Sequence, residues 1–414
     1  MIDIIVIGAG HAGLSISYHL NKLQINHVVF EKGSIGETWR SQRWNSFKLN
    51  TPTKVNLLPG YENNMSDPEG FWTGGEFISL LEEYSRSFRL PVIEGCEVLS
   101  VEKMSGSDFF SVIVFELGNV KKYKCKVVIA ACGFQNKKYF PEISKNISHE
   151  IIQLHAGDFK NASSLPNGAV LVIGSAQSGV QIAEDLVDAG RRVYLSTSRV
   201  GRVPRRYRGK DIVDWMILIG MFDVQTAEIS DPAIIKARMP QSSGAGTRGH
   251  TVSLQSLAGK GVTILGRTIN TDPFNILFQP DVINNIRFAD ETSRNIKSMI
   301  DQYILKSGSE AQPPEEDAAD LPDESGACAS METSIDLKKN KISSIIWTTG
   351  FGRDLSFLKV PVSDGTDILN HHEGISDIEG LYYIGLPWMR KRKSGIIMGI
   401  REDAEFIIKK ICNP

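Results

Sequence analysis

Two glycine-rich turns carry the residues whose types and spacing most clearly indicate chemistry. The first, Gly8-Ala9-Gly10-His11-Ala12-Gly13, follows an apolar run and precedes a segment with helical spacing. In this pattern the first glycine permits the tight turn, the second lets the backbone approach a pyrophosphate, and the third allows close helix-strand packing. The helix N-terminus then faces the phosphates, so the segment predicts a dinucleotide site contacted by Gly8, Gly10, His11, Ala12 and Gly13.

An acidic residue, Glu31, occupies the position at which such a site binds the ribose. Glu31 directly follows the next apolar strand, Val28 to Phe30, and can accept hydrogen bonds from a ribose 2′-OH. The alternative is a glycine turn that binds nothing, but strand, helix and terminal acid together favour the dinucleotide. His11 is interpreted as a helix-start residue near the phosphates rather than as a catalyst.

The second turn, Gly174-Ser175-Ala176-Gln177-Ser178-Gly179, follows another apolar strand and has alanine in place of the second glycine. A methyl group there moves a pyrophosphate slightly outward. The acid expected after the next strand is absent. Ser198 and Arg199 follow that strand instead, and then Arg202, Arg205, Arg206 and Arg208.

These residues predict the choice of nucleotide. A carboxylate would repel a 2′-phosphate, whereas hydroxyl groups and an arginine fork would bind it, so NADPH is favoured over NADH. The alternatives for the arginine run are an exposed charged loop and a nucleic-acid patch. The expected contacts are Gly174, Ala176, Gln177, Ser178, Gly179, Ser198, Arg199, Arg205 and Arg206.

The elements that must position these turns predict an α/β protein with two Rossmann-like dinucleotide-binding domains. Residues 1–160 and 335–414 are expected to form the first domain, which is therefore discontinuous and includes a small antiparallel meander between Val98 and Val128. Residues 161–334 form the second, with a helical insertion. Segments 342–350 and 381–385 are expected as late strands of the first domain. The acidic segment 307–331 is expected to be a mobile surface loop.

Composition excludes several classes of function. The chain has 414 residues, a net charge of −2 and 41% hydrophobic residues, so nothing in it would gather nucleic acid or anionic lipid. It starts without a signal peptide and contains no long apolar run, which favours a cytoplasmic protein without membrane contact. The five cysteines show no C-x-x-C spacing, which argues against a metal site or a redox dithiol.

The segment after Glu31 identifies the first dinucleotide by resemblance. Lys32, then Gly36-Glu37-Thr38-Trp39-Arg40, Trp44 and Leu49-Asn50-Thr51-Pro52 resemble the segment that follows the FAD fingerprint in flavin-containing monooxygenases. The alternative is a surface loop with incidental tryptophans. The resemblance implies FAD at the first turn, with Lys32, Thr38, Trp39, Arg40 and Trp44 near it. It also makes Asn50 the active-site asparagine, whose amide would hydrogen-bond near flavin N5.

Later segments extend the resemblance. Thr349 and Gly350 lie in a segment like the family's A-T-G-[FY] motif, which is expected to join the domains. Gly385 and Gly395 belong to a terminal stretch that approaches the flavin, with a helix starting near Ser394 directed at the ring. A plain packing helix is the alternative. The family's identifying motif is only partly present: His155 and Phe159 fit it, and Ile151 replaces its glycine.

The resemblance implies a monooxygenase that consumes NADPH. Hydride reduces FAD, and oxygen then forms a C4a-(hydro)peroxyflavin that oxygenates a small N-, S- or carbonyl-containing substrate. The alternatives are an NADPH oxidase or flavin reductase without oxygenation, and a noncatalytic FAD/NADPH-binding sensor. The expected partners are a small-molecule substrate and O2. The oligomeric state is open, with a homodimer among the alternatives.

Overall fold

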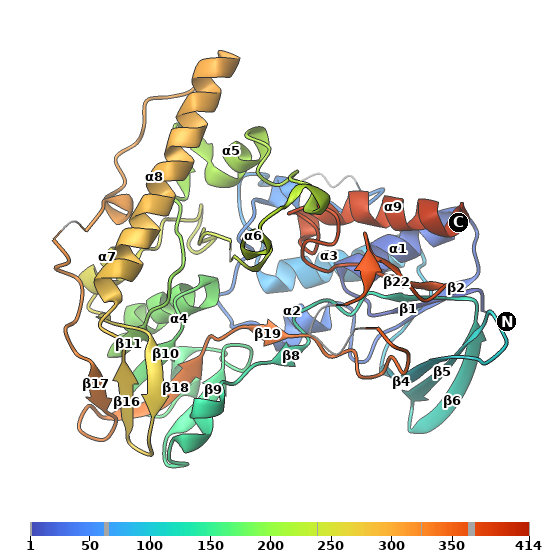
Figure 1. The fold of residues 1–414 in the computed structure, drawn as a ribbon, viewed down its shortest axis with the longest axis horizontal. Coiled ribbons are helices and arrows are strands. Elements are labelled where there is room, and N and C mark those ends of the chain that lie inside the picture. Colours follow the sequence, from blue (N-terminus) through green and yellow to red (C-terminus); the bar gives the residue numbers. More distant parts are fainter. Residues whose placement is uncertain (1, 62–65, 238, 324, 363–368, 414) are drawn as a thin grey trace.

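Two sheets, each with its own helices, lie side by side (Figure 1). The computed structural model describes residues 2–61, 66–237, 239–323, 325–362 and 369–413. We refer to the part built on the first sheet as the first unit, and to the part built on the second sheet as the second unit. The two-sheet α/β architecture predicted from the sequence is confirmed.

The first unit is built on a seven-stranded sheet whose central strands are short, apolar and buried on both faces. Its strand order is β20-β21-β22-β7-β1-β2-β3. The strands β1, β2 and β7 are fully parallel, and Ile5 pairs with both Val28 and Val128. The bounds are β1 (Ile4–Ile7), β2 (His27–Phe30), β3 (Val92–Ile93), β7 (Val127–Ala130), β20 (His371–His372), β21 (Ile375–Ser376) and β22 (Leu381–Tyr383).

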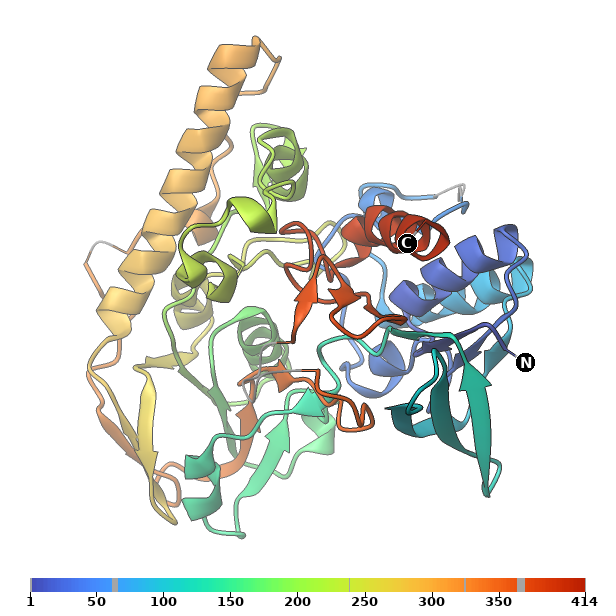
Figure 2. The same ribbon diagram turned by 45° about the vertical axis from the view of Figure 1, so that its right-hand side comes forward.

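Helices cover one face of this sheet and the meander lies beside it. The first helix, α1 (His11–Lys22), packs against the C-terminal helix α9 (Ile400–Cys412), and both views show the two helices together (Figures 1 and 2). The predicted meander is a three-stranded antiparallel sheet, β4 (Cys96–Lys103), β5 (Phe110–Glu116) and β6 (Asn119–Cys125). The remaining helices of the unit are α2 (Glu37–Ser41), α3 (Gly74–Ser87), η1 (Thr53–Val55) and η6 (Ile397–Gly399).

The second unit is built on a five-stranded parallel sheet of order β14-β11-β10-β18-β9. One expectation is corrected here. The strand within 342–350 does not return to the first sheet, because β18 pairs with β10 along its length, from Ile342 to Trp347. The other expected late strand, β22, does join the first sheet. The bounds are β9 (Ile152–His155), β10 (Ala169–Ile173), β11 (Val193–Ser196), β14 (Thr263–Leu265) and β18 (Ile342–Trp347).

Helices and two small antiparallel sheets complete the second unit. The longest helix, α8, is amphipathic and runs along the outer edge of the unit (Figure 1). The helices are α4 (Gln177–Asp188), α5 (Ile212–Leu218), α6 (Pro232–Lys236), α7 (Leu254–Gly259), α8 (Val282–Ser307), η2 (Glu142–Asn146), η3 (Ala162–Ser164), η4 (Thr226–Glu228) and η5 (Ala318–Asp320). The small sheets contain β12 (Arg206–Tyr207) and β13 (Lys210–Asp211), and β15 (Thr268–Thr271), β16 (Asn275–Phe278) and β17 (Ser334–Asp336).

The acidic segment 307–331 lies at the surface, as its composition predicts, and is attached to the second unit through η5. It includes the turn η5, and the side chain of Asp320 is buried. Glu324 lies outside the described residues. The attachment arises because Arg202 and Lys297 of the second unit pair with Asp320.

The chain crosses between the units twice, and the two crossings form an antiparallel ribbon, β8 (Lys137–Lys138) with β19 (Phe351–Gly352). Asn136 and Asp354 exchange two hydrogen bonds at one end of the ribbon, of 3.0 and 2.7 Å. At the other end, Thr349 Oγ1 donates to the backbone carbonyl of Tyr139 at 2.6 Å. Hydrogen bonds therefore stabilise this pair of crossing strands at both ends.

Candidate active site

The first glycine turn has the geometry that its sequence predicts. Gly8 has φ of +105°, and a Cβ there would lie 2.8 Å from the carbonyl oxygen of Ala131. A Cβ on Gly13 would lie 1.9 Å from the Gly8 carbonyl oxygen. Gly10, by contrast, has ordinary φ of −80° and nothing within 4 Å of its Cβ position. Gly8 and Gly13 are thus required because neighbouring backbone atoms leave no room for a side chain, whereas Gly10 leaves open space at the start of α1.

Glu31 lies beside this turn and fixes its backbone. Its two carboxylate oxygens accept hydrogen bonds from Ala9 N at 2.7 Å and Gly33 N at 2.9 Å. Burial raises the pKa of the carboxyl group, although these hydrogen bonds oppose the shift. A carboxylate has about four lone-pair sites, so it can still accept from a sugar hydroxyl group.

The second turn reproduces the first at the backbone level. Gly174 has φ of +110°, and a Cβ on Gly179 would lie 1.9 Å from the Gly174 carbonyl oxygen. Ala176 is the N-cap of α4 with φ −75° and ψ −174°, close to the −80° and −176° of Gly10 at the N-cap of α1. Alanine therefore fits this position without strain.

A single cavity of 1210 Å³ connects the two turns. Its wall includes Gly10 from the first turn, Ala176 from the second, and Asn50 from the loop between Trp44 and Thr53. Of the predicted site residues it is lined by Gly8, Gly10, His11, Ala12, Glu31, Lys32, Thr38, Trp39, Asn50, Ala176, Gln177, Ser178, Gly350, Gly385 and Gly395. The predicted residues outside its lining are Gly13, Arg40, Trp44, Gly174, Gly179, Ser198, Arg199, Arg205, Arg206 and Thr349.

Several buried polar atoms on this wall have no hydrogen-bond partner among the described residues. They are His11 Nε2, Gln42 Oε1, Gln177 Nε2 and Gln181 Oε1. Burial lowers the pKa of His11 to about 4, so its imidazole is neutral at physiological pH. Buried polar groups are normally satisfied, so donors and acceptors left open on one wall indicate a polar ligand. The two glycine turns and these groups fit dinucleotides.

The segment that follows Glu31 is only partly as predicted. Trp39 lines the cavity, and Trp44 is buried behind it against Phe47, with ring centroids 5.1 Å apart. Arg40 turns outward, where it pairs with Glu82 at 2.6 Å. The tryptophans are thus part of the site's wall and its support, and Arg40 is engaged elsewhere.

Arg43 is a cavity residue that the sequence analysis missed. Its guanidinium stacks over Trp39 at 4.9 Å and donates to the Gln135 side-chain oxygen at 2.8 Å. It also donates to the Gln42 carbonyl oxygen, and no carboxylate among the described residues pairs with it. Burial lowers its pKa to about 10, so the side chain remains a cation facing the cavity. A half-buried cation without a carboxylate partner favours a bound anion such as a phosphate. No sequence signal separates Arg43 from its neighbour Arg40.

Asn50 is held from the second unit. Its Oδ1 accepts from Gln181 Nε2 at 3.2 Å, and its backbone carbonyl accepts from Arg205 Nη1 at 2.9 Å. A Cβ on Gly244 would lie 2.1 Å from the Leu49 carbonyl oxygen, so the 243–249 segment also approaches this loop closely. The predicted catalytic residue therefore lies where the two units meet.

The arginine run after β11 does not act as one group. Arg199 is exposed, stacks over Phe288 at 4.4 Å, and has no ion-pair partner among the described residues. Beside it, Ser198 Oγ is buried without a partner. Arg206 is exposed and donates to the Gly209 carbonyl oxygen. Arg199 and Ser198 thus lie just after the carboxyl end of β11, where the ribose of a bound nucleotide would be contacted.

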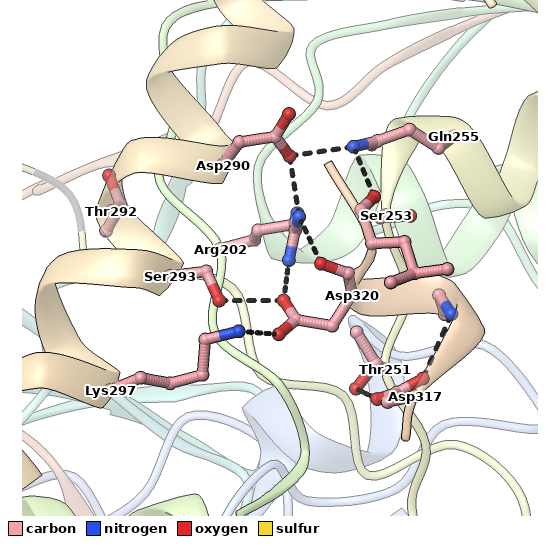
Figure 3. Close-up of polar contacts among 12 residues, drawn as sticks. Arg202, Thr251, Ser253, Gln255, Asp290, Thr292, Ser293, Lys297, Asp317 and Asp320 are labelled. Carbon is pink, nitrogen blue, oxygen red and sulfur yellow. Dashed lines mark hydrogen bonds and ion pairs between the residues drawn. The ribbon is translucent and has the colours of Figure 1, made fainter. Parts of the chain in front are cut away.

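Two other arginines of the run are engaged inside the protein. Arg205, predicted as a nucleotide contact, is 1% exposed and pairs with Asp211. Its hydrogen bonds to two backbone carbonyls use further donors, so Arg205 is not retained as a 2′-phosphate ligand. Arg202 is equally buried and contacts the acidic segment, as Figure 3 shows.

The buried cluster in Figure 3 joins three parts of the second unit. Arg202 pairs with Asp290 of α8 at 2.6 Å and with Asp320 of η5. Asp320 also accepts from Lys297 Nζ at 2.6 Å and from Ser293 Oγ at 2.7 Å. Burial lowers the pKa of Arg202, and the hydrogen bond and charge of Asp290, together with the charge of Asp317, oppose that shift. The cluster explains why the acidic segment is fixed to the second unit.

The C-terminal part of the predicted site approaches the cavity as expected. A Cβ on Gly385 would lie 3.1 Å from Ala12 Cβ, and Gly395 has φ of +84°. The helical segment begins later than predicted, with η6 at Ile397 and α9 at Ile400, while Ser394 Oγ accepts from the backbone N–H groups of Arg390 and Lys391. His155 contacts Gly350 O at 2.8 Å, as a linker residue would.

Two cysteines line the cavity, and both are protonated thiols at neutral pH. Burial raises the pKa of Cys132 to about 12 and that of Cys96 to about 11. All five cysteines of the chain are free. Because the thiolate is the nucleophile in disulfide exchange, neither cavity thiol is activated for it.

Comparison with known proteins gives one family and a set of shared folds. The model of the pyridine nucleotide-disulphide oxidoreductases matches residues 5–215. An uncharacterized CzcO-like oxidoreductase of Geobacillus kaustophilus (strain HTA426) is 29% identical, over 100% of this chain and 99% of the relative. No helix in the described ranges is long and apolar enough to span a bilayer.

Solved structures share the fold across nearly the whole chain. A flavin-containing monooxygenase from Stenotrophomonas maltophilia has a TM-score of 0.64 at 17% identity, covering 99% of this chain and 98% of that one. The bacillithiol disulfide reductase of Bacillus cereus scores 0.62 at 16%, with the same coverage. The protein OTEMO, solved with FAD and NADP, scores 0.58 at 14%, over 99% and 85%. The resemblance to flavin-containing monooxygenases is confirmed, and at these identities what the solved structures share with this chain is the fold.

Proposed function

Since the chain belongs to the pyridine nucleotide-disulphide oxidoreductase family, we propose that this oxidoreductase is an FAD-dependent monooxygenase that consumes NADPH. Its substrate would be a small molecule with a nucleophilic nitrogen or sulfur, or a carbonyl group, and its co-substrate O2. The observation that carries the proposal is the one cavity that both glycine turns share with Asn50.

The first turn would hold FAD. Its open position at Gly10 admits a pyrophosphate at the N-terminus of α1, and Glu31 would bind the adenosine ribose. The orphan Nε2 of His11 and the cation of Arg43 supply further polar contacts on the same wall. A bound FAD would supply a hydride acceptor and, once reduced, a centre that reacts with dioxygen.

The second turn would hold NADPH. Ala176, Gln177 and Ser178 would face its pyrophosphate at the N-terminus of α4, and Arg199 with Ser198 would bind the 2′-phosphate. Asn50 would donate a hydrogen bond near flavin N5. The protein's main task is then to hold both nucleotides against each other and to exclude water, because solvent protons favour release of hydrogen peroxide.

Disulfide reduction is the rival that the shared fold raises. It requires an activated thiol or a second reactive group beside the flavin, and the raised pKa values of Cys96 and Cys132 argue against these thiols. An NADPH oxidase that never oxygenates remains the rival within the proposed chemistry. A noncatalytic sensor is the rival outside catalysis.

One set of measurements separates these functions. The purified protein is incubated with NADPH under 18O-labelled dioxygen and screened by mass spectrometry with amines, sulfides and ketones. The monooxygenase should place one labelled atom in a product. Hydrogen peroxide without any labelled product would assign an oxidase, and failure of NADPH to bleach the flavin in stopped flow would assign a sensor.

A further inference from the structure

Gln181 lies between the two nucleotide sites and contacts the amide of Asn50. It belongs to α4, one helical turn after Gln177, and its side chain is 4% exposed. Its Nε2 donates to Asn50 Oδ1 at 3.2 Å and to Ser243 Oγ at 3.3 Å. Gln181 therefore reaches from the helix of the second turn to the loop of the first unit.

This contact determines which atom of Asn50 remains available. Because Oδ1 accepts from Gln181, the amide nitrogen Nδ2 is the group without a partner among the described residues, on a side chain that lines the cavity. A carboxamide turned by 180° would present an acceptor instead of a donor from the same position. Only a neighbour that donates, as Gln181 does, distinguishes the two orientations.

The orientation of the Gln181 amide follows from its two acceptors. Its own Oε1 is buried without a partner, while Nε2 serves two acceptors. Turned by 180°, this amide would place its carbonyl oxygen against Asn50 Oδ1, acceptor against acceptor, so the orientation in which Gln181 donates is the favoured one. Arg205 adds a second constraint, since its hydrogen bond to the Asn50 carbonyl oxygen fixes the backbone of the same residue.

We propose that Gln181 is a positioning residue that fixes the Asn50 carboxamide with its N–H donors turned to the cavity. This inference rests on the proposed function, because the donor is useful where an oxidised flavin presents N5 as an acceptor. The inference adds that the orientation of the Asn50 carboxamide is determined by a residue of α4, in the second unit, and not by a residue of the first unit.

The test compares four holoenzymes: Gln181→Met, Ser243→Ala, Asn50→Ala and the double variant Asn50→Ala with Gln181→Met. Methionine keeps the volume of glutamine and removes its donor. Ser243→Ala removes the other acceptor of Gln181 and leaves the contact to Asn50 in place. FAD content and melting temperature are measured first, and Gln181→Leu replaces the methionine variant if that protein does not fold.

Two readouts are expected to move together in Gln181→Met. Hydrogen peroxide released per NADPH should rise about two- to tenfold, the effect that one amide hydrogen bond supports. The flavin midpoint potential should become more positive, because a donor to N5 stabilises the oxidised form and that donor is no longer held in place. The apparent KM for NADPH should not change, and Ser243→Ala should match the parent in all three measurements.

The double variant decides whether Gln181 acts through Asn50. If it does, Gln181→Met adds nothing to Asn50→Ala in either readout. Additive effects, an unchanged potential in Gln181→Met, or the same shift in Ser243→Ala would overturn the inference. Failure of the proposed function is distinguishable, since a parent protein that holds no FAD or is not reduced by NADPH fails before any variant is compared. A parent that releases one peroxide per NADPH still reports on Gln181 through its midpoint potential.

Discussion

Gly10 offers the cleanest residue-scale test of the FAD site. Its φ of −80° suits any residue, and a Cβ there meets nothing within 4 Å. Gly10→Val should therefore fold with a melting temperature close to that of the flavin-free parent, yet purify without FAD, because the side chain fills the space of the pyrophosphate. Absorbance at 450 nm and thermal melting measure the two properties.

Gly13→Ala is the matched control for this prediction. Its Cβ would lie 1.9 Å from the Gly8 carbonyl oxygen, so it should damage folding itself. A Gly10→Val protein that keeps one FAD per chain would show that the cofactor binds elsewhere.

Arg199 carries the residue-scale prediction for NADPH. An arginine-phosphate pair contributes about 1.5 to 3 kcal/mol, so Arg199→Ala should weaken NADPH by roughly one to two powers of ten. NADH should be almost unaffected, because it lacks the 2′-phosphate. The measurement is the apparent KM for each nucleotide at low and high salt, since salt screens the same attraction.

Arg192→Ala is the control, because Arg192 is an exposed arginine at the opposite end of the same strand. Equal loss of NADPH and NADH in Arg199→Ala would exclude a 2′-phosphate contact. Arg206 would then be the remaining exposed candidate of the run.

At the scale of elements, the buried cluster of Figure 3 should be a major source of stability. Asp320→Ala leaves Lys297 without its partner and Arg202 with one aspartate fewer, and removal of one member of a buried pair costs about 3 to 5 kcal/mol. Urea unfolding should show this loss, while Glu316→Ala, at an exposed position of the same segment, should change little. Similar stability of the two variants would mean that the acidic segment is not anchored by Asp320.

The elements that sequence reasoning predicted are those specified by local pattern. Both strand-turn-helix units and the antiparallel meander follow from apolar periodicity and from glycines that adjacent backbone requires. Local pattern could not predict which arginines of the run after β11 are exposed and which are paired inside the protein. Arg202 and Arg205 have the same sequence character as Arg199, but their partners include Asp290, Asp320 and Asn50, which lie between 88 and 155 positions away.

The strand β18 shows the same limit for the fold. Its apolar run correctly predicts a buried strand, but not which sheet it joins, because both sheets contain parallel apolar strands of the same character. Likewise, the orientation of the Asn50 amide depends on Gln181, a helix residue that looks like any other polar position in the sequence.

For the whole molecule, the cavity wall extends in sequence from Ile7 to Met398, so ligand binding should stabilise both units together. Added FAD should raise the unfolding free energy of the flavin-free protein by about 2.7 kcal/mol at 100 times its dissociation constant. A single unfolding transition that moves to higher temperature is expected. Two transitions, of which only one responds to FAD, would mean that the units unfold independently.

The paired crossings β8 and β19 also suggest how the second unit could be replaced in evolution. The second unit enters and leaves the first at neighbouring points, where Asn136 and Asp354 are hydrogen-bonded to each other. Recombination at these two points could exchange or resize everything between them while the order of strands in the first sheet stays intact. Such an exchange would also have to rebuild the contacts between the units, among them those of Gln181 and Arg205 with Asn50 and that of Lys54 with Asp214.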